Sequence, residues 1–344
     1  MAEEFANKIK RLELENFTCF GKVALDFSPG INVFIGENGT GKTHLLKVLY
    51  GMSSGADTES TILERVFKVF SDSELVKKEN FKSGIVLTYK NKQVSCEILE
   101  RPIKGALIAE SSAIYMNNKR LFIPTLELLS WFKGFISSYE KRESYIDETF
   151  YYLAKAIDPL PLKGNVLAEQ KPLMTDLETA INARVIRRGD DFFVEFLAEG
   201  RAYPVQTVAT GINKLAQLIY LIMNGSLTKD TILFWDEPEA NLNPKYILVV
   251  SKFLQTLAKA GCQIFVATHD YLLPYDLSLS KEYQDVEGNV PDMKFFSLYK
   301  GENGTAVEEG ATMSDLHHDP IHEGLSQHNN REDVLFRKSL NPQA

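Results

Sequence analysis

Eight residues, GENGTGKT at 36–43, have the types and spacing of a phosphate-binding loop. They satisfy the pattern G-x-x-x-x-G-K-T between an apolar segment, INVFIG, and a helix-forming run, HLLKVLY. Glycines let backbone N–H groups point at phosphate oxygens, and the helix N-terminus adds partial positive charge. Lys42 is expected to neutralise the β and γ phosphates, and the Thr43 hydroxyl is suited to Mg²⁺. The residues expected to hold the nucleotide are Gly36, Glu37, Asn38, Gly39, Thr40, Gly41, Lys42, Thr43 and His44.

Two acids follow a second apolar segment, in TILFWDEPEANLNP at 231–244. They stand at the carboxyl end of a predicted buried strand, the edge at which α/β proteins bind ligands. Asp236 is suited to hold Mg²⁺, and Glu237 is suited to polarise an attacking water as general base. Kinases and GTPases also carry phosphate-binding loops, but this adjacent pair of acids favours an ATPase.

A histidine follows a third apolar segment, in VATHD at 266–270. One strand and one helix after the acid pair, His269 is expected at the same sheet edge, where its imidazole can bond the γ-phosphate and the attacking water. The other late histidines, in HHDPIH at 317–322 and at 328, have no firm metal-ligand spacing.

The whole chain has the composition of an ordinary globular protein. Its 344 residues are 44% hydrophobic and 24% charged, with no apolar run of signal-peptide or membrane-span length. Cys19, Cys96 and Cys262 are scattered, which predicts neither disulfides nor zinc. We expect a cytoplasmic protein with no membrane partner. The net charge of -8 argues against non-specific coating of nucleic acid but allows one basic groove.

The hydrophobic pattern predicts an α/β fold: a mixed, mostly parallel sheet with an antiparallel N-terminal lobe and a helical insertion. Strands are expected at 8–15, 22–27, 31–36, 84–90, 93–100, 112–116, 231–235, 262–268 and 294–300, with a hairpin over 184–197. Helices are expected after the loop, over 124–157, over 167–183 with an interruption near Pro172, and at 211–223 and 244–259. The predicted units are an ATPase lobe at 1–119, the insertion at 120–205, a second ATPase lobe at 206–304 and a C-terminal helical segment at 305–344.

These motifs resemble a known family. The stretch from KIKRLELENF to GTGKT, together with DEPEANLNP and THD, resembles the RecF, SMC and Rad50 group of ABC-type P-loop ATPases. GENGTGKTHLLK, FIPTLELLS and VATGINKLAQL are most similar to the stand-alone AAA-type ATPases found beside OLD-family proteins and in bacterial antiphage defence systems. The resemblance implies ATP and Mg²⁺ as cofactors. It also implies a homo-oligomer, at least a head-to-tail dimer that sandwiches ATP between one P-loop and the partner's signature segment.

The signature segment departs from the family pattern Leu-Ser-x-Gly. The aligned residues are Val208, Ala209, Thr210 and Gly211, so the serine hydroxyl is missing. Thr210, the helix N-terminus at Gly211 and Lys214 are expected to compensate; alternatively, GINKLAQL is only an amphipathic helix. The family's Q-loop glutamine is also missing. Glu127 takes its place, either as a ligand of magnesium or water or as a solvated residue at a helix start.

Two functional hypotheses follow. In the first, a hydrolysing ATPase dimerises on ATP and acts on DNA or controls a separate effector, a nuclease or toxin, in antiphage defence. In the second, an ATP-loaded scaffold with slow or no hydrolysis sequesters or senses a partner protein. Basic residues for DNA contact cluster at 8–11, 77–82, 118–120 and 184–188, although such clusters are often only solvated faces.

Overall fold

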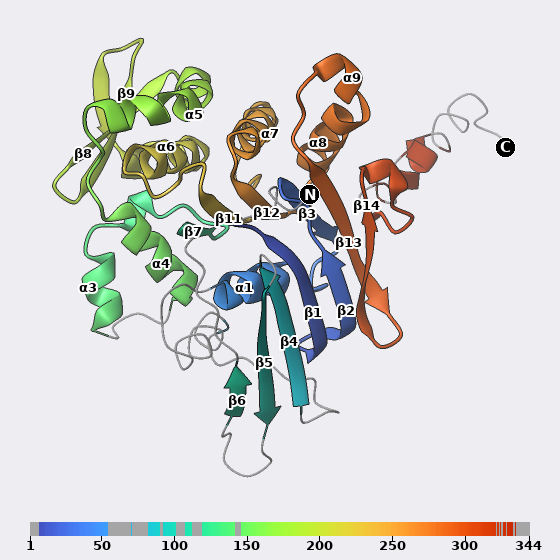
Figure 1. Ribbon diagram of the computed structural model, residues 1–344. Helices are drawn as coiled ribbons and strands as arrows, with labels where there is room; N and C mark the ends of the chain where they lie inside the picture. Colours follow the sequence, from blue (N-terminus) through green and yellow to red (C-terminus); the bar gives the residue numbers. More distant parts are fainter. Residues whose placement is uncertain are drawn as a thin grey trace.

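An eleven-stranded sheet runs through the chain, and helices pack against its parallel half (Figure 1). The computed structural model describes residues 7–53, 70, 82–89, 92–100, 107–111, 119–141 and 146–320, with scattered positions between 322 and 334. The strand order is β6-β5-β4-β1-β2-β14-β13-β3-β12-β11-β7, and a separate three-stranded sheet has the order β10-β9-β8. This arrangement confirms the predicted mixed α/β fold.

The strands of the large sheet are β1 (Ile9–Phe17), β2 (Phe20–Asp26), β3 (Ile31–Gly36), β4 (Lys82–Tyr89), β5 (Lys92–Glu100), β6 (Leu107–Ser111), β7 (Lys119–Ile123), β11 (Thr231–Asp236), β12 (Gln263–Ala267), β13 (Met293–Gly301) and β14 (Gly304–Gly310). Those of the small sheet are β8 (Ala183–Arg188), β9 (Asp191–Phe196) and β10 (Arg201–Pro204). The α-helices are α1 (Lys42–Met52), α3 (Phe135–Glu140), α4 (Glu148–Ile157), α5 (Asn165–Ile181), α6 (Thr210–Met223), α7 (Pro244–Lys259), α8 (Leu272–Glu282) and α9 (Gln284–Glu287). Short 3₁₀ turns are η1 (Leu129–Trp131), η2 (Val205–Thr207) and η3 (Met313–Asp315).

The half of the sheet from β13 to β7 is parallel. Every residue of β3, β11 and β12 is buried, as expected for strands that are covered on both faces. Alternate side chains enter two cores. Phe34, Phe234 and Phe265 pack on the α1 side, whereas Val33, Ile35 and Trp235 belong to the core that contains α4 to α7. This packing aligns the carboxyl ends of the three strands that precede the predicted site residues.

The antiparallel N-terminal lobe consists of β1, β2, β4, β5 and β6. Its predicted strands at 8–15 and 22–27 and its hairpin over 84–100 are confirmed, while the strand expected at 112–116 lies outside the described residues. The sequence did not reveal β6, β14 or α8. As a consequence, the segment predicted to be helical from residue 305 begins inside a strand, since β14 occupies 304–310 and completes a hairpin with β13.

The insertion combines helices with the small antiparallel sheet. The single helical stretch expected over 124–157 contains η1, α3 and α4, and Gly134 separates the first two by taking a left-handed conformation (φ 74°). The interruption expected at Pro172 was wrong: α5 runs through it, with the ring on the exposed face while Leu173, Met174 and Leu177 hold the helix by burial. The predicted boundary at residue 120 falls within β7, which pairs with β11 in the large sheet.

One arginine of the 184–188 cluster is part of the insertion's core. The Arg187 side chain is only 7% exposed and lies near the rings of Phe132, Phe192 and Tyr220. Its guanidinium donates to the carbonyls of Ile157, Asp158 and Gly189. Arg187 is therefore a structural cation and is not available to DNA.

Replacing Arg187 by Ala should destabilise the insertion by about 3 kcal/mol, because three carbonyls lose a charged donor and the rings lose their packing partner. Urea unfolding monitored by tryptophan fluorescence would measure the loss. Arg184, exposed on the same strand, provides the matched control, and Arg184→Ala should change the unfolding free energy by less than roughly 0.5 kcal/mol. Equal effects of the two substitutions would refute the structural role.

Candidate active site

The predicted loop joins β3 to α1 and requires glycine at two positions. Gly36 has φ 151°, and a Cβ there would lie 2.4 Å from the Leu298 carbonyl oxygen. Gly41 has φ 95°, and a Cβ there would lie 2.4 Å from the Cys19 sulfur at the turn between β1 and β2. The loop thus presses its backbone against β13 on one side and the N-terminal lobe on the other, which holds its N–H groups in place before any ligand arrives.

The Lys42 side chain lies along the inside of this loop. It is 7% exposed, and Nζ donates to the carbonyls of Gly36 (2.7 Å) and Glu37 (2.9 Å). Burial lowers the pKa of Lys42, and the nearby charges of Glu237, Asp236 and Glu239 oppose that shift. Within the described part of the chain this charged donor bonds neutral carbonyls, so it is placed to donate instead to phosphate oxygens, which are stronger acceptors.

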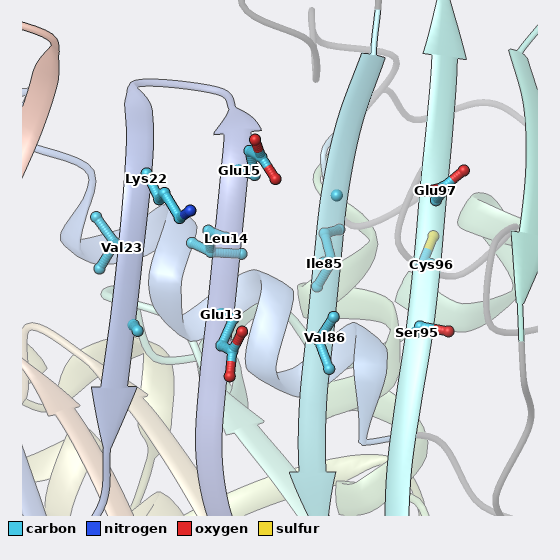
Figure 2. A pocket seen from close by; sticks show the side chains of 12 residues that line it. Glu13, Leu14, Glu15, Lys22, Val23, Ile85, Val86, Ser95, Cys96 and Glu97 are labelled. Carbon is cyan, nitrogen blue, oxygen red and sulfur yellow. The ribbon is translucent and has the colours of Figure 1, made fainter.

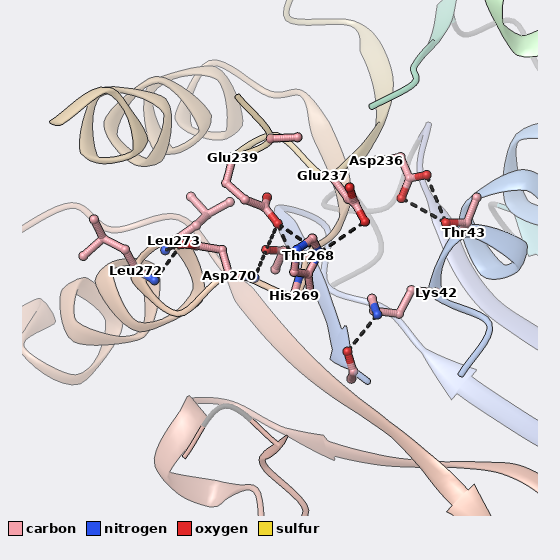
Figure 3. Close-up of polar contacts among 12 residues, drawn as sticks. Lys42, Thr43, Asp236, Glu237, Glu239, Thr268, His269, Asp270, Leu272 and Leu273 are labelled. Atoms are coloured by element: carbon pink, nitrogen blue, oxygen red, sulfur yellow. Dashed lines mark hydrogen bonds and ion pairs between the residues drawn. The ribbon is translucent and has the colours of Figure 1, made fainter. Parts of the chain in front are cut away.

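Thr43 and Asp236, the two residues that the sequence predicts to hold magnesium, lie within hydrogen-bond distance of each other. The Thr43 hydroxyl lies 3.0 and 3.2 Å from the two carboxylate oxygens of Asp236 (Figure 3). Burial raises the pKa of Asp236 to about 6, helped by the charge of Glu237 and opposed by the Thr43 hydrogen bond. Two hard oxygen donors, one of them a carboxylate removed from water, fit Mg²⁺, which usually takes few protein ligands and completes its shell with phosphate and water. Among the described residues, no larger cluster of His, Cys, Asp or Glu could hold a metal.

Glu237 has an uncommon backbone conformation, with φ 48° in the left-handed region. Its N–H donates to the Ala267 carbonyl at the end of β12 (2.8 Å), which continues the strand pairing by one residue. Its side chain meets His269, whose Nδ1 lies 3.1 Å from the Glu237 carboxylate. The structure therefore brings together Lys42, Thr43, Asp236, Glu237 and His269 at one edge of the sheet, where the sequence had predicted them (Figure 3).

A second glutamate, Glu239, joins this group, and the sequence reasoning did not include it. Its side chain is 6% exposed, and Oε1 accepts hydrogen bonds from the Thr268 hydroxyl (2.7 Å) and the His269 N–H (3.2 Å). The motif DEPE already contained the third acid, but only the turn after β11 brings its side chain to the loop after β12 that carries Thr268 and His269.

The proposed compensating role of Lys214 was wrong. Lys214 is 2% exposed and points into its own chain, where Nζ donates to the carbonyls of Glu237 (2.7 Å) and Ala240 (3.1 Å). Burial lowers its pKa to about 8. Lys214 thus cannot reach a nucleotide held by another subunit. It instead ties α6 to the strained turn that carries Glu237.

The signature segment presents its first residues to solvent. Ala209 and Thr210 are exposed at the N-terminus of α6, with Ala209 as the N-cap. Gly211 packs against the turn after the acids, since a Cβ there would lie 2.7 Å from the Asn241 carbonyl oxygen. The exposed side of this helix start is accessible to a partner, whereas its inner side packs against the turn that contains Asn241.

Two other residues that the sequence predicts at the site, Glu127 and His44, contact neighbouring residues of the same chain. Glu127 is 6% exposed rather than solvated, and its two oxygens accept from the Ser130 hydroxyl (2.5 Å) and the Ser130 N–H (3.2 Å), so it caps η1. The His44 ring packs edge-on against Phe70 (5.3 Å between centroids), and burial lowers its pKa. A phosphate contact at His44 would therefore come from its backbone N–H.

The chain matches known proteins in sequence and fold. Residues 8–160 match the family described as "AAA ATPase domain", and residues 127–274 match "AAA domain, putative AbiEii toxin, Type IV TA system". The DNA replication and repair protein RecF of Staphylococcus haemolyticus is 28% identical over 266 residues, which are 69% of this chain and 67% of that protein. RecF of Streptococcus uberis is 41% identical over 68 residues, 20% of this chain and 16% of that protein.

The fold has solved counterparts. The SMC head bound to the C-terminal winged-helix domain of ScpA aligns with a TM-score of 0.56 at 14% identity, over 89% of this chain and 98% of that one. Of the helices that the structure describes, none has the length and apolar character needed to cross a membrane.

Replacing Lys214 by Met should change how stability depends on pH. The folded-state pKa of about 8 is below the usual 10.5, so between these values the unfolded chain binds a proton that the folded chain has released. Stability of the wild type relative to Lys214→Met should therefore rise by about 2 kcal/mol from pH 7.5 to pH 10. Chemical unfolding at a series of pH values would test this. Lys245→Met, at an exposed lysine of α7, should leave the wild-type pH dependence unchanged.

Proposed function

We propose that this chain, which matches two AAA ATPase family models and is similar in sequence to RecF, binds ATP at residues 36–44 and hydrolyses it in a head-to-tail dimer. The observation that carries the proposal is the convergence of Lys42, Asp236, Glu237 and His269 at one sheet edge. We further propose that the exposed Ala209 and Thr210 of each subunit cover the ATP of the other.

In the proposed reaction, a water oxygen attacks the γ-phosphorus. The bond between the γ-phosphorus and the β–γ bridging oxygen breaks, so that ADP leaves, and the Glu237 carboxylate accepts the proton of the attacking water. Lys42 stabilises charge on the β and γ oxygens, and His269 orients the γ-phosphate and the water. Mg²⁺, held by Thr43 and Asp236, would neutralise charge that develops on the phosphates.

The charges on the outer face of the N-terminal lobe indicate whether the proposed ATPase acts on DNA through that face. A hollow of about 580 Å³ lies over β1, β2, β4 and β5 (Figure 2), and the small residues Ala24 and Gly84 are among those that line it. Glu13, Glu15 and Glu97 line it together with Lys22. This face carries more negative than positive charge, which disfavours the DNA backbone there.

The basic clusters give limited support to direct DNA binding. Arg11 is paired with Glu13 and Asp26, and Arg187 is buried. Lys77, Lys78 and Asn118 lie outside the described residues. We therefore favour control of a separate cytoplasmic effector, a nuclease or toxin in antiphage defence, over direct action on DNA. The match to the family described as "AAA domain, putative AbiEii toxin, Type IV TA system" supports a link to a toxin–antitoxin system.

The Glu237→Gln variant should accumulate as an ATP-bound dimer, because it keeps the nucleotide site and loses the base that starts hydrolysis. Light scattering after size exclusion would give its mass with and without ATP and Mg²⁺, and the wild type should return to the monomer as ATP is consumed. Adding Lys42→Ala should abolish the dimer. A variant that stays monomeric in saturating ATP would contradict the ATP-sandwich proposal.

The alternative, an ATP-loaded scaffold with slow hydrolysis, is favoured by one observation: Lys214 is buried, so it does not replace the missing signature serine. If the missing hydroxyl limits turnover, Ala209→Ser should raise kcat about tenfold by adding one hydrogen bond to the γ-phosphate. Steady-state phosphate release would measure this, with Thr207→Ser, at an exposed position in η2, as control. An unchanged kcat would show that the departure in the signature does not limit the rate.

A further inference from the structure

A buried carboxylate that the proposed mechanism does not use lies directly behind His269. We propose that Glu239 is a positioning residue: its charge holds the His269 ring with the proton on Nδ1, so that Nε2 is the nitrogen available to the nucleotide. The catalytic effect of this arrangement rests on the proposed function. The arrangement of Glu239 and His269 itself is present in the protein without ATP.

The distances around His269 support this role. Glu239 Oε1 lies 3.7 Å from His269 Nδ1, and Glu237 Oε1 lies 3.1 Å from the same nitrogen. A carboxylate can only accept a hydrogen bond, so two carboxylates on one side of an imidazole favour the tautomer with hydrogen on Nδ1. Glu239 also fixes the backbone below the ring, through its hydrogen bond from the His269 N–H.

Burial of the charged Glu239 side chain costs folding free energy. Its side chain is 6% exposed, Oε2 has no hydrogen-bond partner within the described part of the chain, and burial raises its pKa. An unpaired buried carboxylate oxygen costs free energy. The Thr268 hydroxyl and the His269 N–H need only an acceptor, which the amide of a glutamine would supply without that cost. We therefore attribute the negative charge at Glu239 to its interaction with the His269 imidazole.

A neighbouring acid does not share this role. Asp270 Oδ1 accepts from the N–H groups of Leu272 and Leu273, so Asp270 caps the start of α8 (Figure 3). Glu237 contacts the ring, but in the proposed reaction it must also accept a proton from water. Glu239 has no such second task, and it can hold the histidine throughout the cycle.

The test compares Glu239→Gln, His269→Ala and the double variant. Glu239→Gln keeps the acceptor and removes the charge, so kcat should fall about tenfold while the affinity for a fluorescent ATP analogue stays within about twofold. In the double variant, kcat should equal that of His269→Ala alone, because Glu239 acts only through the ring. A wild-type kcat in Glu239→Gln, or multiplied effects in the double variant, would overturn the proposal.

A second readout does not depend on turnover. Imidazole ¹⁵N chemical shifts in the nucleotide-free protein report which ring nitrogen carries the proton. The wild type should show His269 protonated on Nδ1, and Glu239→Gln should shift it toward a mixture of tautomers. As a matched control, Glu308→Gln removes the carboxylate 3.1 Å from His318 Nδ1 and should leave the His269 signals unchanged. If the wild type fails to hydrolyse ATP, the proposed function fails, whereas an unchanged His269 tautomer in Glu239→Gln refutes the positioning role.

Discussion

The parallel pairing of β3, β12 and β11 is the constraint on which the candidate site depends. Ala267 of β12 lies opposite Phe34 of β3 and Asp236 of β11, so β11 and β12 end at the same level and β3 extends two residues further, to Gly36. Pairing continues one residue further, since the Glu237 N–H bonds the Ala267 carbonyl and the Thr268 N–H bonds the Phe34 carbonyl. Because these strands are buried on both faces, a shift of register would disrupt both cores. Residues far apart in sequence are thereby held within hydrogen-bond distance.

Opposite charges reduce the free-energy cost of burying ionisable groups at this edge of the sheet. Burial raises the pKa of Asp236 and of Glu239 and lowers that of Lys42 and of Lys214. The acids in turn favour the charged form of both lysines and so offset part of the desolvation of Lys42 and Lys214, whereas the charges of Glu237 and Glu239 raise the pKa of Asp236 further. The result is a set of fixed charges and dipoles that needs little rearrangement when a triphosphate enters, which is the property that electrostatic catalysis requires.

Helix α6 connects this edge to the rest of the molecule. Lys214 bonds the turn that carries Glu237, while Gln217 Oε1 accepts from the Leu128 N–H and Asn213 Nδ2 donates to the Ser130 hydroxyl. The exposed start of the same helix is the segment that we propose covers the partner's ATP. A partner that displaces α6 would therefore act at once on the turn after the acids and on the entry to the insertion. This connection would give any partner that binds the insertion a physical route to the turn that carries Glu237.

The sequence by itself determined the local chemistry. A loop with glycines at 36 and 41, an acid pair after one buried strand and a histidine after another are readable because short-range spacing sets backbone shape and strand ends. The mixed sheet and the helices at 211–223 and 244–259 followed from periodicity for the same reason. Only the tertiary structure decided that Lys214 faces inward, that Arg187 is a core residue, that Glu127 caps a turn and that Glu239 supports His269. Those roles depend on which long-range neighbours meet a side chain and on how far they exclude water, and neither is encoded in the spacing along the chain.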